Sequence, residues 1–125
     1  MIHLDTHVVV WLFAGELDRL SKAACAAIEE EPLAICPIVT LEIEYLYEIG
    51  RLERPEEDII GRLQARIGLR YCSTPWHEVV TQAVPLSWTR DPFDRLIVAA
   101  ALAEDARLLT KDVVIRQNCA RAFWD

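Results

Sequence analysis

The sequence predicts an α/β fold in which a central parallel sheet is covered by helices. The first observation is that short apolar runs alternate along the chain with longer segments of helical periodicity. The second is size, because 125 residues of which 53% are hydrophobic are enough to bury a core. The third is continuity, since no repeat, low-complexity tract or linker interrupts the chain. We therefore expect a single domain spanning residues 1–125.

Four apolar runs are predicted as strands, and six further segments are predicted as helices. The strands are Ile2–Asp5, Leu33–Cys36, Leu69–Cys72 and Arg107–Thr110. The helices lie near residues 7–14, 21–30, 38–49, 55–67, 75–83 and 92–104. Right-handed crossovers would make neighbouring strands parallel, giving a sheet of four to five strands. Sites in such sheets form at the carboxyl ends of the strands.

The first strand ends in a carboxylate where an apolar residue would be expected. Asp5 closes the run that begins at Met1, and so falls at the carboxyl edge of the predicted sheet. The second and third strands carry cysteines instead. The four cysteines are widely spaced and contain no Cys-x-x-Cys pair: Cys25, Cys36, Cys72 and Cys119. This spacing predicts small, buried residues in a reducing compartment.

The helix predicted at 38–49 places a glutamate among apolar residues. At about 100° per residue, Glu42 lies about 40° from Ile38, within an apolar arc, whereas Glu44 lies at about 240°. That arc also holds Leu41, Tyr45, Leu46 and Ile49. We expect Glu42 to point inward and Glu44 to meet solvent. A partly exposed Glu42 in a local salt bridge is the alternative.

The helix predicted at 92–104 begins with two aspartates that need to be told apart. Asp91 suits the N-cap, Pro92 the first helical position and Asp94 the third. Capping therefore explains either aspartate. Asp94 also shares a helical face with three apolar residues, Ile97, Val98 and Ala101. We therefore favour a ligand role for Asp94 and a capping role for Asp91.

A fourth carboxylate, Asp112, follows the last predicted strand. An isolated buried carboxylate is costly unless it is paired, hydrogen-bonded or bound to a metal. Four of them at the ends of elements indicate one acidic pocket, and such pockets usually hold Mg²⁺ or Mn²⁺. The expected ligands are Asp5, Glu42, Asp94 and Asp112.

The chain is acidic, with 13 Lys and Arg against 20 Asp and Glu and a formal net charge of −7. Taken alone, this charge argues against a nucleic-acid-binding protein, because phosphates favour basic surfaces. The net charge would be about −3 if two divalent cations neutralised the four carboxylates. Acidity therefore weakens a nucleic-acid function without excluding it.

No segment predicts a membrane or secretory protein. The longest apolar run, residues 96–103, is far shorter than a membrane span. The N-terminus lacks the basic start and small-residue cleavage site of a signal peptide. A cytoplasmic location is therefore expected.

Four segments carry a resemblance that extends over nearly the whole chain. They are Ile2-His3-Leu4-Asp5-Thr6-His7, Pro37-Ile38-Val39-Thr40-Leu41-Glu42-Ile43, Arg90-Asp91-Pro92-Phe93-Asp94-Arg95-Leu96-Ile97 and Leu109-Thr110-Lys111-Asp112. In order and spacing they resemble the PIN-domain family, specifically the VapC-type toxins of type II toxin–antitoxin pairs. The resemblance implies a three-layer fold and a divalent-metal endoribonuclease that acts as the toxin of such a pair. It matches the four acids to the family's catalytic, metal-binding quartet.

The resemblance also implies neighbours and partners. Thr6, Thr110 and Asp91 would lie beside the quartet, with the threonines orienting carboxylates or water; simple strand-end hydroxyls are the alternative. The expected partners are an RNA substrate, a second copy of the chain, and an antitoxin lying near residues 45–54 that reaches the pocket with an arginine. Much of the phosphate contact would fall to five arginines, Arg51, Arg54, Arg62, Arg66 and Arg70.

Three other functions remain to be weighed. A phosphoacceptor receiver module needs paired acids after its first strand and an aspartate after its third, but Asp5 stands alone and Cys72 is followed by Ser73. A phosphatase with an aspartate nucleophile needs a second carboxylate where His7 stands. A metal-free interaction domain, in which the acids are only caps, is distinguished by its lack of Mn²⁺ binding.

Overall fold

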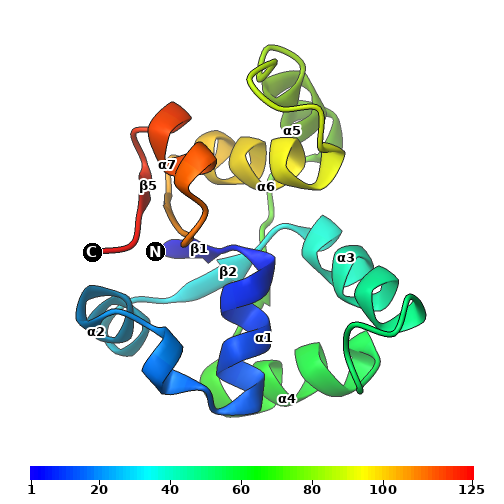
Figure 1. The fold of residues 1–125 in the computed structure, drawn as a ribbon. Helices are drawn as coiled ribbons and strands as arrows, with labels where there is room; N and C mark the ends of the chain where they lie inside the picture. Colours follow the sequence, from blue (N-terminus) through cyan, green and yellow to red (C-terminus); the bar gives the residue numbers. More distant parts are fainter.

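The central strand of the molecule is β1 (Ile2–Leu4), and two parallel strands flank it on each side (Figure 1). The computed structural model describes residues 1–125. The sheet order is β3-β2-β1-β4-β5, with β2 at Leu33–Ile35, β3 at Arg70–Tyr71, β4 at Arg107–Leu109 and β5 at Ala122–Phe123. All four pairings are parallel. The predicted α/β fold with a parallel sheet is therefore confirmed.

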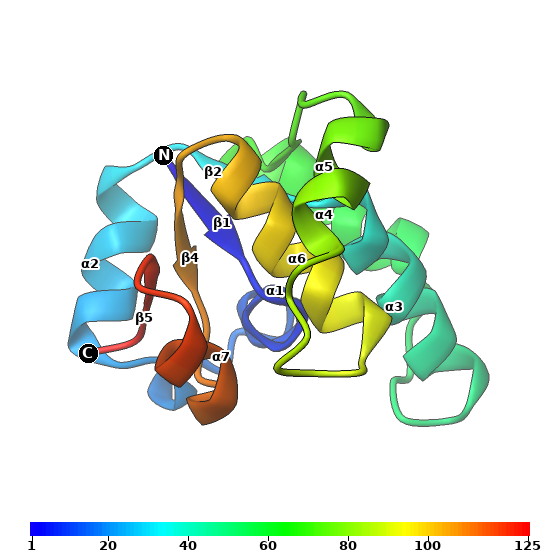
Figure 2. The same ribbon diagram turned by 90° about the horizontal axis from the view of Figure 1, so that it is seen from above.

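Seven helices and one 3-10 turn connect the strands. They are α1 (Thr6–Ala14), η1 (Leu17–Arg19), α2 (Lys22–Glu30), α3 (Pro37–Glu48), α4 (Glu56–Ile67), α5 (Trp76–Ala83), α6 (Pro92–Ala103) and α7 (Val113–Asn118). Helices α5 and α6 pack together, α1 contacts both α3 and α4, and α3 also contacts α6. Figure 2 shows α6 running alongside β1 and β4 in the opposite direction, so its first turn lies at the carboxyl edge of the sheet.

The core is a cluster of 28 buried residues between the sheet and its helices. Ile2 and Leu4 of β1 are fully buried, as expected for a central strand covered on both faces. On α6, Ala99, Ala100 and Ala101 are also fully buried, and these small side chains let the helix approach its neighbours closely. No helix has the length and apolar character needed to cross a membrane. The expected cytoplasmic location stays a prediction.

Two C-terminal elements were not predicted from the sequence. Helix α7 has six residues, and Val113 and Val114 at its start are half-exposed while only Ile115 is buried. Such a helix has no apolar periodicity to recognise. Strand β5 has two residues and forms a sheet edge. The predicted strand Leu69–Cys72 is likewise only two residues long, because it lies at the opposite edge.

The structure corrects the predicted orientation of α3. Its buried residues are Val39 and Ile43, whereas Leu41 and Tyr45 are 58% and 47% exposed. The apolar arc used to place Glu42 is therefore mostly a surface. Glu42 lies at the border between the surface and the core, and is half-buried.

Glu44 also differs from the prediction that it meets solvent. It is partly buried, and its carboxylate accepts a hydrogen bond of 3.1 Å from the backbone N–H of Glu56. That N–H is at the start of α4, where backbone donors lack partners within the helix. Glu44 thus links α3 to α4.

Candidate functional site

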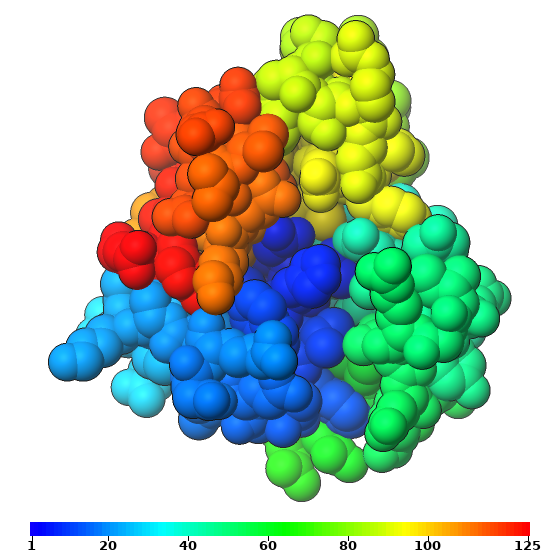
Figure 3. Space-filling view, viewed as in Figure 1, coloured from blue at the N-terminus to red at the C-terminus, as the bar shows by residue number.

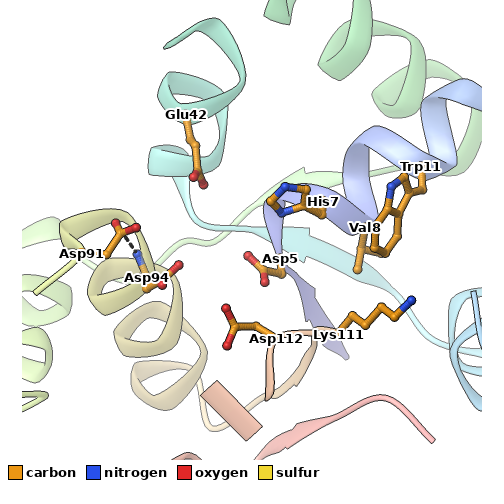
Figure 4. Close-up of a pocket in the computed structure, with 9 residues that line it drawn as sticks. All are labelled: Asp5, His7, Val8, Trp11, Glu42, Asp91, Asp94, Lys111 and Asp112. Atoms are coloured by element: carbon orange, nitrogen blue, oxygen red, sulfur yellow. Dashed lines mark hydrogen bonds between the residues drawn. The ribbon is translucent and has the colours of Figure 1, made fainter. Parts of the chain in front are cut away.

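A pocket of about 400 Å³ opens at the carboxyl edge of the sheet, where β1, β4, α3 and α6 converge. Figure 3 shows the hollow where blue, orange, yellow and blue-green segments meet. Its lining includes all four predicted ligands together with the predicted neighbour Asp91 (Figure 4). The lining residues are Asp5, His7, Val8, Trp11, Glu42, Asp91, Asp94, Lys111 and Asp112. Residues separated by more than 100 positions in the sequence therefore share one pocket.

Asp5 is the most buried carboxylate of the pocket, with 8% of its surface exposed. It is the N-cap of α1, and accepts hydrogen bonds of 2.8 Å from the backbone N–H of Thr6 and 2.6 Å from the hydroxyl of Thr110. These donors favour the charged form, but burial outweighs them and raises the pKa of Asp5. The Asp5 carboxylate is thus held in one orientation at the floor of the pocket.

Glu42 is fixed in a similar way from α3. The buried hydroxyl of Thr6 donates to its carboxylate at 2.5 Å. Burial is again the largest influence and raises the pKa of Glu42, with a further contribution from the nearby charge of Asp5. Both predicted threonines therefore donate a hydrogen bond to a carboxylate of the pocket.

Asp91 and Asp94 occupy different environments on the first turn of α6. The Asp91 carboxylate caps the helix, accepting from the backbone N–H of Phe93 at 2.8 Å and of Asp94 at 3.4 Å. Asp94 is half-buried. Burial, followed by the charges of four neighbouring carboxylates, raises its pKa to about 7. Burial and the neighbouring like charges both disfavour the ionised form of Asp94. A bound cation would favour that form instead.

Asp112 completes the acidic wall from the end of β4. Its side chain is the N-cap of α7 and accepts from the backbone N–H of Ile115 at 2.9 Å. Its own backbone N–H donates to the hydroxyl of Thr110 at 3.0 Å. Thr110 thus connects Asp112 to Asp5, since the same hydroxyl donates to the Asp5 carboxylate.

The donor set fits a hard divalent cation. Five carboxylates face one pocket, and their mutual repulsion is visible in the raised pKa of Asp94. Oxygen donors of this kind suit Mg²⁺ and Mn²⁺. No three His, Cys, Asp or Glu side chains are close enough to enclose an ion. Mg²⁺ is usually bound by one or two carboxylates and keeps several waters, so it does not need a site enclosed by three side chains.

The opposite wall of the pocket is aromatic and basic, and it was not predicted from the sequence. His7, Trp11 and Lys111 lie on this side (Figure 4). The signals were present in the sequence: Trp11 lies one helical turn after His7, and Lys111 directly precedes Asp112. None of the five arginines expected to contact phosphate lines the pocket, and their contact with RNA stays a prediction. Arg54 and Arg62 instead pack over the ring of Phe13.

The chain is similar in sequence to known proteins. Residues 2–120 match the PIN domain family. The chain is 36% identical, over 117 residues, to Ribonuclease VapC22 of Mycobacterium tuberculosis, an alignment covering 92% of this chain and 89% of that protein.

Two solved structures have the same fold. VapBC2 from Rickettsia felis, bound to a DNA fragment from its promoter, matches at a TM-score of 0.66 with 20% identity and full coverage of both chains. VapBC-1 from nontypeable Haemophilus influenzae matches at 0.64 with 17% identity, covering 100% of this chain and 97% of that one. The family match over residues 2–120 and the 36% identity to Ribonuclease VapC22 show that the chain belongs to the PIN-domain family.

Proposed function

We propose that this protein is a divalent-metal-dependent endoribonuclease and the toxin of a toxin–antitoxin pair. The observation that carries the proposal is the single pocket into which β1, α3, α6 and the end of β4 each bring a carboxylate. The similarity to a named VapC ribonuclease over 92% of the chain supports the same activity.

The residues have distinct parts in the proposed reaction. Asp5 and Asp94 would hold Mg²⁺ or Mn²⁺, with Glu42 and Asp112 completing the site directly or through water. When bound, the cation would activate a water molecule for attack on an RNA phosphodiester. Thr110 and Thr6 keep Asp5 and Glu42 oriented through their hydrogen bonds. No catalytic histidine is required.

RNA cleavage with and without EDTA, in the wild type and Asp5→Asn, tests this function. Wild-type protein with Mn²⁺ should cleave structured RNA that contains single-stranded loops, and EDTA should stop the cleavage. Asp5→Asn should be inactive although folded, because an amide oxygen carries no charge to offset a cation, and Asn is nearly as good an N-cap as Asp. Cleavage by Asp5→Asn at the wild-type rate would refute the metal site. Calorimetry without any Mn²⁺ binding would instead support a metal-free interaction domain.

We further propose that an antitoxin segment occupies a second groove, which also borders α1. This groove lies between α1 and the loop after α3, and is lined by Val10, Phe13, Ala14, Glu16, Arg51, Leu52, Glu53, Arg54 and Ile59. It includes part of the 45–54 segment expected to contact the antitoxin. A peptide that followed α1 from this groove could place an arginine among the pocket carboxylates, where it would take the place of the cation.

Co-expression provides the test. The antitoxin encoded beside this chain should abolish its toxicity and co-purify with it. Leu52→Glu should weaken that complex while leaving RNA cleavage intact, because the substituted side chain lies outside the acidic pocket. Unchanged toxicity on co-expression would contradict the pairing.

A second copy of the chain would cover the apolar surface formed by α3, α5 and the start of α6. We call this the α3–α5 surface. Its exposed residues include Leu41, Tyr45, Trp76, Val80 and Val84, each 40% to 68% exposed. Two adjoining grooves share Trp76 and make the surface continuous. The two half-exposed aromatic residues, Tyr45 and Trp76, contribute on the order of 100 Å² each, so a standard interface of roughly 800 Å² per partner would also have to include neighbouring residues of these helices.

Sedimentation or light scattering should therefore show a dimer at micromolar concentration. Val80→Glu should yield a monomer with unchanged secondary structure. The glutamate would be exposed to water in the monomer, but a dimer would bury its charge in an apolar interface. Val113→Glu, at a valine of α7 that is more exposed than Val80 and lies outside this surface, should leave the dimer intact. A wild type that is monomeric at these concentrations would contradict the dimer.

A further inference from the structure

The acidic pocket has an aromatic and basic wall that metal binding alone does not require. Trp11 lines the pocket and remains partly exposed. Its indole lies 6.0 Å from the ring of the buried Trp124 in an edge-on arrangement at 68°. On the same helix, His7 lies 6.0 Å from it at 46°. Trp11 is thus an aromatic side chain next to the carboxylates, held in place by contacts with two other rings.

Two cationic side chains lie over this ring, and one of them, Arg19, also forms an ion pair with Glu16. The Nζ of Lys111 lies 5.9 Å and the guanidinium carbon of Arg19 lies 5.8 Å from its centroid. Lys111 is the only Lys or Arg among the residues that line the pocket. In a chain of net charge −7, attraction of a polyanion depends on such local positive groups.

We propose that Trp11 stacks against one unpaired base of the RNA, while Lys111 and Arg19 contact the adjoining phosphates. An aromatic face flanked by cations is the arrangement by which proteins bind single strands, since every base offers a face for stacking and every linkage a charge. A base held within a duplex could not reach the ring, so the base that stacks on Trp11 is an unpaired one. This inference rests on the proposed ribonuclease function, for which it names a residue that binds the substrate.

The central test separates stacking from packing by comparing Trp11→Phe with Trp11→Leu. Both side chains keep an apolar contact with Trp124, but only Phe offers a face to a base. Binding to short, labelled, single-stranded RNA is measured by fluorescence anisotropy in Mn²⁺, with RNA integrity checked on a gel and folding checked by thermal melting. Trp11→Phe should bind within about twofold of wild type, and Trp11→Leu roughly tenfold more weakly.

A series of RNAs with single abasic positions identifies the stacked base. At one position, loss of the base should weaken wild-type binding and remove the difference between the Phe and Leu variants. Tyr47→Leu, which removes an exposed aromatic outside the pocket, should change nothing. Lys111→Ala should reduce the slope of log K against log salt by about one, and Lys111→Arg should restore it.

The outcomes distinguish this inference from the proposed function. Equal binding by Trp11→Phe and Trp11→Leu to every RNA, in a protein that cleaves RNA, overturns the stacking role and leaves the ribonuclease intact. If Trp11→Phe binds RNA more tightly than Trp11→Leu but the wild type never cleaves RNA, the ribonuclease function is overturned and the stacking role is kept. Absence of any RNA binding overturns both.

Discussion

Asp91 and Asp94 are three residues apart on one helical turn, yet their surroundings give them different chemistry. The backbone N–H groups of Phe93 and Asp94 satisfy the Asp91 carboxylate. The surroundings of Asp94 contribute burial and four like charges, and all of these raise its pKa. The first carboxylate therefore stabilises the helix, while the second is available to a cation.

Substituting each aspartate by asparagine tests this distinction. Asp91→Asn keeps a good N-cap, so the free energy of unfolding should change by roughly 0.5 kcal/mol or less, with Mn²⁺ affinity nearly unchanged. Asp94→Asn should weaken Mn²⁺ binding sharply and abolish cleavage. Calorimetry and RNA cleavage of both variants provide the measurement. An inactive Asp91→Asn beside an active Asp94→Asn would reverse the assignment.

His3 is a second residue whose role follows from its surroundings. It is 1% exposed on β1, and its Nε2 lies 2.7 Å from the Glu104 carboxylate at the end of α6. Its other ring nitrogen, Nδ1, has no partner. The Glu104 contact is therefore the one hydrogen bond that compensates for burial of the ring.

Glu104→Ala should accordingly lower the free energy of unfolding by about 1 to 3 kcal/mol, because it leaves a buried polar ring without a partner. Glu31→Ala is the matched control. It also breaks ion pairs, with the N-terminus and Arg107, but these are more exposed, so its effect should be about 1 kcal/mol or less. Equal effects in urea unfolding would argue against a structural role for the His3–Glu104 pair.

At the scale of elements, Thr110 joins three parts of the fold. It follows β4 and is fully buried. Its hydroxyl donates to Asp5 at the end of β1 and accepts from the N–H of Asp112, the N-cap of α7. One hydroxyl thereby links the Asp5 carboxylate to the backbone of Asp112.

Thr110→Val keeps the shape of this side chain and removes its hydroxyl. The free energy of unfolding should fall by about 1 to 3 kcal/mol, since the Asp112 N–H loses its partner and Asp5 loses a donor. Mn²⁺ affinity should fall with it. Thr81→Val, at an exposed site on α5 where the hydroxyl bonds only within its own helix, should change stability by roughly 0.5 kcal/mol or less. Equal behaviour of the two variants would contradict the bridging role.

At the scale of the whole molecule, the carboxylates link stability to pH and to metal. The raised pKa of Asp94, about 7, means that the folded metal-free protein binds more protons than the unfolded chain between the two pKa values. The contribution of Asp94 to the free energy of unfolding is therefore fully present below the unfolded pKa of about 3.9. It is lost as the pH rises towards the folded pKa of about 7. A bound cation favours the ionised carboxylates and should oppose the loss.

Urea unfolding in EDTA at about pH 5 and about pH 8 tests this linkage. The wild type should lose more stability between these pH values than Asp94→Asn, and comparison of the two proteins cancels the other titrating groups they share. Mn²⁺ should restore wild-type stability at the higher pH and have much less effect on Asp94→Asn. Parallel pH profiles without metal would contradict the assigned pKa direction.

The sequence by itself determined the fold class and the residues that would meet at the edge of the sheet. Strands β1, β2 and β4 are short apolar runs whose burial on both faces leaves few other arrangements. The position of Asp5 after β1, and the cap sequence at Asp91 and Pro92, are local features that neighbouring residues specify. Such features depend on separations of a few residues, so a sequence displays them directly.

Only the tertiary structure decided which apolar faces are buried and what surrounds each carboxylate. Leu41 and Tyr45 have the pattern of core residues but remain exposed, because the side of α3 that packs into the core carries Val39 and Ile43 instead. The Thr110–Asp5 hydrogen bond joins residues 105 positions apart, and the aromatic wall at Trp11 forms only when α1, β4 and the C-terminus meet. Side-chain periodicity records that a face is apolar, while packing over long separations in the chain decides what covers it.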